Sequence, residues 1–447
     1  MRILLTVHQF LPDYASGTEI LTRSVARELL SRGHEVHVLT GFPAQQPLAD
    51  EDRFDEYDFE GIHVYRFHHA YTAMAGQRSR IELDYDNHLA AEHFAGVLKR
   101  FQPDVVHCFH LSRLGTGLIE RATQANIPIY LTPTDFWAIC LTAQLLLPNN
   151  RMCHGPNAQA GNCVKHLAQN TQQGLAATCA RWLPTPMANL LVSLTRNGVL
   201  PAYPQHAEVT AISSRLATNV SRLNRLTKIV APNRFMRDLL VRHGVQPQRI
   251  VLSAFGIDVT PTDTQERRSP PRQPFRVGFI GTLAQHKGCH VLIESFKSMP
   301  PGRAILKIYG NPTDFPDYAA ALKRQADPNP AIEFCGVFPN ASIAQVLDDL
   351  DVLVVPSLWY ENTPLVLYSA QARRCPVLAS HFPGISDVIE DEVNGLLFEP
   401  GNAADLARQL LRLMAETGLA ERLAAQARPP KPTASYVDEL LAIWNFN

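Results

Sequence analysis

An apolar run followed by a glycine-bounded loop, Phe275-Arg-Val-Gly-Phe-Ile-Gly-Thr-Leu-Ala-Gln-His-Lys-Gly288, indicates the architecture of this chain. The run predicts a buried strand, and the loop opens a helix-length segment. Further runs of this kind follow, each separated from the next by a helix length. The strands predicted from here on are Phe275–Ile280, Ala304–Tyr309, Ile332–Phe334, Val352–Val355 and Val377–Ala379. Such alternation is typical of a parallel, doubly wound sheet.

The same alternation precedes this segment. The strands predicted there are Ile3–Val7, Glu35–Leu39, Ile62–Phe67, Val105–Cys108, Ile127–Leu131, Lys228–Ala231 and Ile250–Leu252, with helices at Thr18–Ser31 and ending near Arg100. Residues 259–274, rich in Pro, Thr and Arg, break the periodicity and are typical of a linker. We therefore predict two Rossmann-like α/β domains facing a cleft: residues 1–258, with a helical, basic insertion at about 137–206, and residues 275–428.

The end of the chain is predicted to be helical. Helix-forming residues dominate from Ala403 to Ala425, and Tyr436–Trp444 carries apolar side chains at helical spacing. The segment 429–447 is expected to form a helix that crosses back to the first domain. A frayed tail is the alternative.

The composition is that of an ordinary globular protein. The chain has 447 residues, of which 46% are hydrophobic and 19% charged, and this length allows about two to four domains. The formal net charge of −1 argues against nucleic acid as a partner. Because no window offers about 18 uninterrupted apolar residues, we expect no spanning helix.

Cysteine usage indicates a reducing compartment. The apolar run that starts at Ile3 is too short for a signal peptide, and eight cysteines without a leader predict free thiols in the cytoplasm. Cys140, Cys153 and Cys163 cluster near His166, but they lack a C-x2-C pair. Unpaired thiols are therefore favoured over a structural metal site.

Loops that follow strands carry the candidate chemistry, since ligands of open α/β sheets bind at the carboxyl ends of the strands. The loop Gly281–Gly288 opens a helix and contains Lys287. Glycines allow close backbone approach, helix N–H groups attract anions, and the lysine adds charge, which together favour a phosphate site. The loop is neither G-x-G-x-x-G nor a Walker A sequence, so a dinucleotide or an NTPase site is not supported.

A second loop, between the predicted strand Val352–Val355 and the next helix, contains Glu361. We predict that Asn362 or Thr363 caps this helix and that Pro364 lies in its first turn, so that Glu361 precedes a helix N-terminus. Free N–H groups there can meet an anionic ligand. Ser369 would then lie roughly 12 Å further along the helix axis.

These segments occur in an order that resembles one known family. Gly281–Gly288, Glu361–Ala370, Gly256–Asp258, Ala231–Phe235 and Asn394–Phe398 together resemble a family 4 glycosyltransferase (glycosyl transferases group 1) of the GT-B fold. The resemblance covers nearly the whole chain. It implies a retaining transfer of a sugar from a nucleotide-diphosphate donor, without a catalytic metal or other cofactor, to a sugar or lipid-linked acceptor in cell-surface polysaccharide or glycolipid synthesis.

The resemblance also implies roles for particular residues. Glu361 matches the glutamate that holds donor sugar hydroxyls, Lys287 the lysine that neutralises the leaving diphosphate, and His110 the histidine that faces the donor sugar. Gly17 matches the glycine that lets the diphosphate approach. The remaining donor-binding positions are Gly281, Thr282, Asn362, Thr363, Leu365 and Ser369. The sequence shows no convincing catalytic dyad, which agrees with a mechanism that has no enzyme nucleophile.

Two positions depart from the family. Its diphosphate-binding arginine is Thr282 here, and its second motif glutamate, which grips the ribose, is Ser369. The loss of a charged acceptor weakens a contact of about 1.5–3 kcal/mol. A catalytically weakened nucleotide-sugar sensor or assembly subunit is therefore the alternative function.

Other polar residues receive weaker assignments. Asp135, in Thr134-Asp-Phe-Trp137, is a candidate on the acceptor side. His8 and His107 are interpreted as structural histidines at strand ends. The pairs Asp84/Asp86 and Asp349/Asp351 resemble a metal-binding D-x-D, but both flank helices and are not expected to bind metal.

The near-zero net charge conceals an asymmetry. Residues 136–237 contain one acidic residue, Glu208, and ten basic ones, a local balance of +9. Within them Leu175–Leu200 mixes apolar residues with Arg181, Trp182 and Arg196, as an amphipathic surface segment does. We predict that residues 136–237 contact an anionic membrane surface, so that a cytoplasmic protein lies on the inner face of the membrane. The alternative is a helical pair that only covers the sheet.

Overall fold

The computed structural model describes residues 1–447 except 45, 71, 148–150, 172–180, 260–270 and 446–447. The chain divides into two compact units. Unit 1 comprises Met1–Ala254 and Thr433–Asn447, and unit 2 comprises Phe255–Pro432. Most of the predicted linker, and the first part of Leu175–Leu200, lie outside the described residues.

Unit 1 is built on an eight-stranded sheet in the order β3-β4-β2-β1-β5-β6-β7-β8. Its strands are β1 Arg2–Val7, β2 Glu35–Pro43, β3 Phe54–Phe59, β4 Ile62–His69, β5 Val105–Cys108, β6 Ile129–Leu131, β7 Lys228–Ala231 and β8 Ile250–Leu252. All neighbours are parallel except β3 and β4, which form an antiparallel pair. The predicted strands are confirmed within a few residues, but β3 was not predicted.

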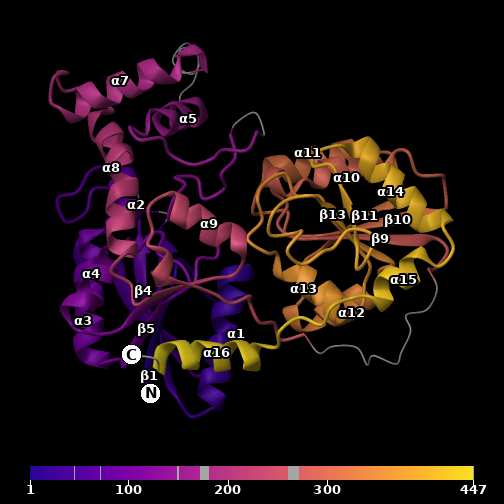
Figure 1. Ribbon diagram of the computed structural model, residues 1–447, viewed down its shortest axis with the longest axis horizontal. Coiled ribbons are helices and arrows are strands. Elements are labelled where there is room, and N and C mark those ends of the chain that lie inside the picture. The colour runs from indigo at the N-terminus through magenta and orange to yellow at the C-terminus, as the bar shows by residue number, and fades with distance from the viewer. Residues whose placement is uncertain (45, 71, 148–150, 172–180, 260–270, 446–447) are drawn as a thin grey trace. The chain divides into compact units, whose positions relative to one another are not determined.

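The helices of unit 1 are α1 Gly17–Ser31, α2 Arg80–Tyr85, α3 His88–Phe101, α4 Gly117–Gln124, α5 Gly161–Thr171, α7 Thr185–Arg196, α8 His206–Leu223, α9 Arg234–Arg242 and α16 Thr433–Asn445. Helices α5 and α7 belong to the insertion between β6 and β7, and α8 leads back from them to the sheet (Figure 1). Short 3-10 turns lie at Asp50–Arg53 and Pro247–Arg249.

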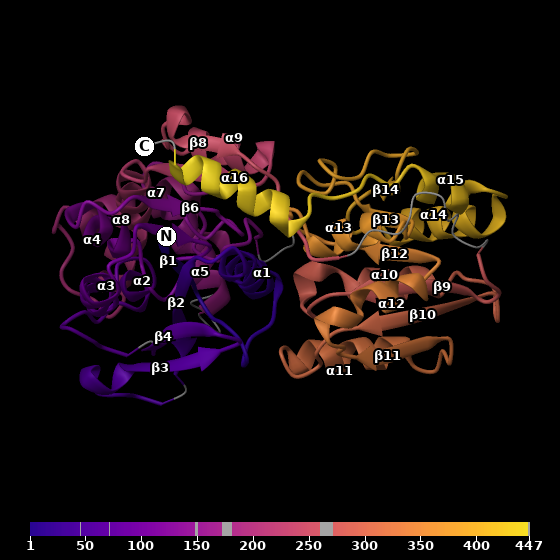
Figure 2. The same cartoon turned by 90° about the horizontal axis from the view of Figure 1, so that it is seen from below.

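Unit 2 has a six-stranded, all-parallel sheet in the order β11-β10-β9-β12-β13-β14, whose strands Figure 2 shows side by side. Its strands are β9 Phe275–Ile280, β10 Ala304–Tyr309, β11 Ile332–Gly336, β12 Val352–Val355, β13 Val377–Ser380 and β14 Leu396–Phe398. The helices are α10 Cys289–Phe296, α11 Pro316–Ala326, α12 Ile343–Asp348, α13 Leu365–Ala372, α14 Ala403–Ala415 and α15 Leu419–Ala425, with 3-10 turns at Gln285–Lys287 and Asn340–Ser342.

The alternation of side chains along the strands of unit 2 fills two cores. Val352 and Val354 of β12 pack with α10, α11, α14 and α15, whereas Leu353 and Val355 pack on the other face with α12 and α13. Successive strand side chains point to opposite faces, so a strand covered on both sides must be apolar throughout. The doubly wound α/β fold predicted for this half is confirmed.

The C-terminal helix α16 packs on unit 1. Trp444 donates from Nε1 to Nδ1 of His107 at 3.2 Å, and the Tyr436 hydroxyl lies 3.2 Å from Thr132 Oγ1. His107 also contacts Thr132 through Nε2 at 2.9 Å. Burial lowers the pKa of His107 to about 3, so this histidine is neutral and structural, as predicted.

Removal of the Trp444 side chain tests this attachment. Trp444 is only 5% exposed, so we expect Trp444→Ala to lower the free energy of unfolding of unit 1 by about 3–5 kcal/mol. Chemical denaturation measures the loss. Ser435→Ala, at an exposed position of the same helix, is the control. Equal stability of the two variants would show that α16 does not support unit 1.

Candidate active site

The strand order of unit 2 reverses between β9 and β12. The chain leaves β9 toward β10 on one side, and β12 pairs with β9 on the other side. Loops at the carboxyl ends of such neighbouring strands border a crevice, where α/β proteins bind ligands. The loop Gly281–Gly288 follows β9, and the loop that contains Glu361 follows β12. The two candidate loops of the sequence therefore meet at this point.

Lys287 and Glu361 form an ion pair across these loops. Lys287 Nζ lies 2.8 Å from Glu361 Oε1. The same oxygen accepts hydrogen bonds from Ser357 Oγ at 2.5 Å and from Trp359 Nε1 at 2.8 Å. No hydrogen bond from a described residue reaches the second oxygen, Oε2. One carboxylate oxygen is thus held by three donors, and the other remains able to accept hydroxyl groups.

The surroundings of Glu361 keep it ionised. Its side chain is 5% exposed, and burial alone would raise its pKa. The charge of Lys287 and the hydrogen bonds from Lys287, Ser357 and Trp359 outweigh that effect, so the pKa of Glu361 lies below its ordinary value. A buried carboxylate held in this way is a fixed negative group at neutral pH.

Two glycines allow the loops to approach closely. A Cβ at Gly288, where φ is +72°, would lie 1.8 Å from the carbonyl oxygen of Pro356. A Cβ at Gly384, where φ is +84°, would lie equally close to the carbonyl oxygen of Glu361. Leu358 N donates to His286 O at 2.8 Å, and this bond joins the two loops directly. These contacts fix the backbone on both sides of the ion pair.

The helix cap predicted beside Glu361 is wrong. Helix α13 begins at Leu365, Pro364 occupies its N-cap position, and no side chain caps it. Thr363 has φ +64°, a left-handed conformation that β-branched residues rarely adopt. Strain of this kind gathers at functional sites. The estimate of roughly 12 Å from Glu361 to Ser369 assumed a continuous helix. It does not apply, because residues 361–364 are not helical.

The other predicted donor residues of unit 2 surround these two loops. Thr282 is half-buried. Gly281 has φ outside the left-handed region, and a Cβ there would make ordinary van der Waals contact with the Phe279 ring at 3.6 Å. The fold therefore does not require a glycine at 281. Asn362 is buried beside Glu361. Ser369 is buried on α13 and donates from Oγ to Leu365 O at 3.2 Å.

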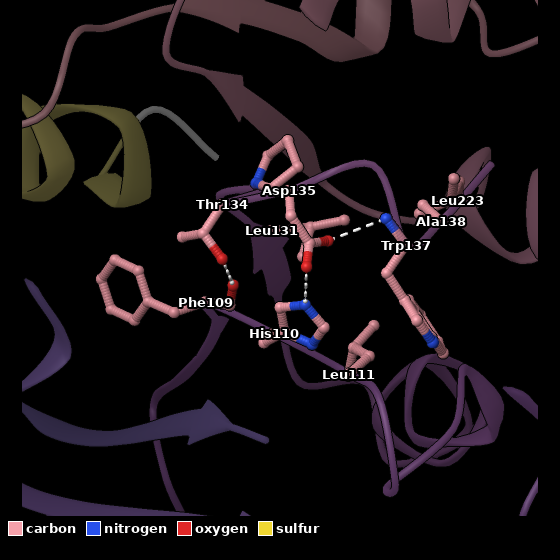
Figure 3. A pocket seen from close by; sticks show the side chains of 10 residues that line it. Phe109, His110, Leu111, Leu131, Thr134, Asp135, Trp137, Ala138 and Leu223 are labelled. Atoms are coloured by element: carbon pink, nitrogen blue, oxygen red, sulfur yellow. Dashed lines mark hydrogen bonds and ion pairs between the residues drawn. The ribbon is translucent and has the colours of Figure 1, made fainter. Parts of the chain in front are cut away.

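The sheet of unit 1 reverses in the same way between β1 and β5, and His110 follows β5. His110 lines a pocket with Asp135 and Trp137 (Figure 3). Nε2 of His110 lies 2.9 Å from Asp135 Oδ2, and Nδ1 accepts a hydrogen bond from Ser112 N at 3.0 Å. The proton of a neutral ring therefore sits on Nε2 and points to Asp135.

Asp135 holds this histidine rather than standing free. Its other oxygen, Oδ1, accepts from Trp137 N at 2.7 Å. A carboxylate and an imidazole are thus paired here, a contact that the sequence analysis did not predict. Both ring nitrogens of His110 already have partners, so the ring is fixed in one tautomer and one orientation.

A histidine that sequence analysis assigned to structure belongs to the same cluster. The ring of His8, after β1, lies 4.2 Å from the ring of His110, and its Nε2 lies 3.5 Å from Glu19 Oε1. Burial, and then the neighbouring His110 and Arg113, lower the pKa of His8, while burial raises the pKa of Glu19. Burial thus disfavours the charged form of both groups. The strand reversal between β1 and β5 is the signal that could have identified them.

The first turn of α1 lies beside this cluster. Gly17 is the exposed first residue of α1, and no side chain caps this helix. Thr18 donates from Oγ1 to Thr134 Oγ1 at 3.0 Å, which ties α1 to the loop that carries Asp135. Uncapped N–H groups at a helix start attract anions. The start of α1 thus offers free N–H groups beside Gly17, and its role at a diphosphate stays a prediction.

The D-x-D pairs hold the fold together instead of a ligand. Asp84 accepts from Ser112 Oγ at 2.8 Å and from Trp137 Nε1 at 2.6 Å. Asp86 pairs with a buried arginine of α8, and Asp349 pairs with Lys307 at 2.7 Å. Both carboxylate pairs are therefore occupied by protein donors.

The cysteines of the insertion gather around one small cavity. Cys140, Cys153, Cys163 and His166 line it, and the three cysteines are free. Burial raises the pKa of Cys163 to about 12, so this thiol is protonated. Among the residues that the structure describes, no group of three or more His, Cys, Asp or Glu side chains is placed to hold a metal ion.

Two family models match the chain. Glycosyltransferase Family 4 matches residues 15–162, and Glycosyl transferases group 1 matches residues 262–429. Amylovoran biosynthesis glycosyltransferase AmsK of Erwinia amylovora is 29% identical over 206 residues, which cover 43% of this chain and 49% of that protein. Putative colanic acid biosynthesis glycosyltransferase WcaL of Salmonella typhimurium is 28% identical over 173 residues, 37% of this chain and 42% of that protein. The chain thus spans about half the length of such relatives, or less.

Solved structures share the whole fold. Anabaena HepE in complex with UDP and glucose has a TM-score of 0.64 at 16% identity and covers 100% of this chain and 99% of its own. Sucrose-phosphate synthase from Thermosynechococcus elongatus has a TM-score of 0.61 at 17% identity and covers 99% of this chain and 96% of its own. The fold is GT-B. The chain belongs to the glycosyltransferases of group 1 and family 4.

The ion pair of unit 2 predicts a pH-dependent loss of stability. Lys287→Met leaves the buried Glu361 carboxylate without its cation, so we expect a loss of about 1–3 kcal/mol at pH 7. In the wild type the depressed pKa of Glu361 contributes stability above pH about 4.5, and this contribution disappears as pH falls through the folded-state pKa. The difference between the two proteins should therefore shrink below pH about 4.5, as followed by thermal denaturation.

Lys297→Met is the matched control, because Lys297 forms an exposed ion pair with Glu294 on α10. Such a pair contributes about 1 kcal/mol or less. If the difference between Lys287→Met and wild type stayed constant from pH 7 to pH 3, the ion pair would not be the source of stability.

Proposed function

We propose that this chain transfers a sugar from a nucleotide-diphosphate sugar to an acceptor hydroxyl, with retention of configuration and without a catalytic metal. The observation that carries the proposal is the Lys287–Glu361 pair at the strand reversal of unit 2. It offers an ammonium group and an open carboxylate oxygen side by side. A sugar diphosphate presents both groups that such a pair can bind, an anionic phosphate for the ammonium group and neighbouring hydroxyls for the carboxylate oxygen.

In the proposed reaction the bond between sugar C1 and the diphosphate oxygen breaks, and a bond between C1 and the acceptor oxygen forms. The acceptor's proton passes to the departing diphosphate. Negative charge grows on that diphosphate, and Lys287 with the uncapped N–H groups of α13, starting at Leu365, would stabilise it. Glu361 would accept donor sugar hydroxyls at Oε2. The resemblance to the family supports retention and metal independence.

Residues of unit 1 receive further roles in this proposal. We assign His110 to catalysis at the donor sugar, and Asp135 to fixing its tautomer and orientation. Gly17 would let the diphosphate approach the start of α1. The remaining proposed donor contacts are Gly281, Thr282, Asn362, Thr363 and Ser369.

Relatives indicate which substrates to test. HepE was solved with UDP and glucose, so UDP-glucose is the first donor to examine beside GDP- and ADP-sugars. The names of AmsK and WcaL refer to amylovoran and colanic acid biosynthesis. We therefore propose an acceptor that is a sugar or a lipid-linked sugar in polysaccharide or glycolipid synthesis, met at the cytoplasmic face of an anionic membrane. No helix in the described parts of the chain is long and apolar enough to cross a membrane.

A second candidate function rests on Thr282 and Ser369. Each puts a neutral hydroxyl where the family has a charged side chain. The chain would then be a nucleotide-sugar sensor or assembly subunit that binds donor without turning it over. Binding and turnover, measured separately, distinguish the two functions.

Glu361→Ala is the first test. We expect it to lower the release of UDP from UDP-glucose by at least about 100-fold, because the open carboxylate oxygen is lost. Glu333→Ala, at an exposed carboxylate of β11, should keep wild-type turnover. If the wild type binds donor in thermal-shift assays but releases no UDP, the sensor is the function. If no nucleotide sugar raises its melting temperature, the donor class is wrong.

Ser369→Glu tests the ribose contact. Restoring an ionised acceptor should tighten donor binding about ten- to a hundredfold, as measured by calorimetry. Ser369→Gln introduces the same volume without the charge and should not tighten binding to that extent. Unchanged or weaker binding of Ser369→Glu, in a variant that melts like the wild type, would mean that this pocket holds the ribose in a different way.

A further inference from the structure

Helix α7 of the insertion is apolar on two faces. Ala188 and Val192 are buried, and α7 packs against α5 and α8. On the outer side Met187, Leu190 and Leu191 are 54%, 59% and 45% exposed. Positions 187, 190 and 191 recur at the three- and four-residue spacing of one helix face. A contiguous apolar face that the fold leaves exposed marks a surface that another molecule covers.

Exposed apolar side chains gather in this part of the chain. In the described residues ten large apolar side chains are exposed, and five of them lie between Trp182 and Val199. Trp182 is 78% exposed, just before α7, and Val199 is 64% exposed, just after it. Scattered single exposures are ordinary, whereas a contiguous set marks an interaction surface. We call Trp182, Met187, Leu190, Leu191 and Val199 the α7 patch. Helix α7 lies at the outer end of unit 1, away from its sheet (Figure 1).

The charges next to the α7 patch have one sign. Residues 136–207 contain no Asp or Glu, and their basic residues are Arg151, Lys165, Arg181 and Arg196. Arg181 and Arg196 are exposed, just before α7 and at its last residue, and neither forms an ion pair with a described residue. The patch thus combines apolar side chains with a cationic rim, which is the pattern of helices that lie in the interface of an anionic membrane.

Part of the other positive charge of residues 136–237 is used inside the fold. Arg215 is buried and donates to the carbonyl oxygen of Trp137. Arg222 pairs with Asp86 and Glu120, and Arg225 pairs with Glu120 as well. The broad basic stretch is therefore not one cationic surface. The positive charge that remains accessible includes the rim of the α7 patch.

We infer that the α7 patch docks on the surface of an anionic lipid bilayer, with α7 lying in the plane of the interface. The helix has 12 residues, about 18 Å of length, and cannot span a core of about 30 Å. A second copy of the chain fits less well, because a two-fold contact would bring the arginines of one rim close to those of the other. In an anionic bilayer the acyl region takes up the apolar face, and the headgroups pair with the arginines of the rim. The inference deepens the proposed function by naming the surface where a lipid-linked acceptor is met, and it rests on that function only for the acceptor.

Vesicle flotation of the full chain tests the docking. The vesicles contain phosphatidylcholine alone or phosphatidylcholine with phosphatidylglycerol. Wild type should float with the anionic vesicles, and Leu190→Gln/Leu191→Gln should float at least about tenfold less. Leu411→Gln, at an exposed leucine of α14 in unit 2, should float like the wild type. Arg181→Gln/Arg196→Gln should lose about fivefold per arginine of the preference for anionic vesicles.

Several outcomes would overturn the inference. One is wild type that does not float with anionic vesicles. Another is a Leu190→Gln/Leu191→Gln protein that floats like the wild type. A third is light scattering that shows a dimer for wild type and a monomer for this variant without a change in flotation, because a second copy would then cover the patch.

Donor hydrolysis in solution keeps the two proposals apart. Leu190→Gln/Leu191→Gln should release UDP from UDP-glucose at the wild-type rate and melt at the wild-type temperature, since both side chains are exposed. Flotation without hydrolysis in the wild type would contradict the proposed function and support the docking of the α7 patch on the membrane. Hydrolysis without flotation would do the reverse.

Discussion

The reversal of strand order is the constraint on which both candidate half-sites depend. In each unit a first strand, β1 or β9, pairs with two neighbours whose connections run in opposite directions. The loops after β9 and β12, or after β1 and β5, then lie next to each other at the carboxyl edge of the sheet, where their side chains and helix N–H groups can bind a ligand. His8 and His110 in unit 1, and Lys287 and Glu361 in unit 2, all follow these four strands.

The Lys287–Glu361 pair shows how charged side chains are kept at the strand reversal of unit 2. A carboxylate that is nearly fully buried costs desolvation energy, which a single surface-type ion pair does not offset. Three donors converge on Oε1, and two glycines hold the backbone close enough for them to do so. The open Oε2 and the left-handed Thr363 are features that folding alone does not favour. Their place beside uncapped N–H groups is what a bound sugar diphosphate would explain.

Periodicity predicted the alternation of strands and helices, because parallel strands covered on both faces must be apolar throughout, as β12 is. It missed β3, since Phe54–Phe59 alternates with acidic residues at an edge of the sheet. Motif order predicted which loops matter, and the structure brings Lys287 and Glu361 together as the motifs implied. Sequence could not show that Asp135 pairs with His110 or that the His8 ring lies against it. Those contacts join loops that follow different strands, so the spacing of residues within one segment cannot predict them.

The accessible charge was the property that the sequence predicted least well. A local balance of +9 in residues 136–237 does not tell which arginines form ion pairs inside the fold. Arg222 sits between Asp86 and Glu120, residues from outside the basic stretch, so its charge serves the packing of α8 against α2 and α4. The sequence predicted an amphipathic segment near α7. Periodicity cannot tell which of the two apolar faces of this helix is covered by the rest of the fold. The structure separates these effects. Internal pairing uses part of the positive charge, and the buried Ala188 and Val192 use one face of α7. What remains is a smaller surface with a defined chemistry.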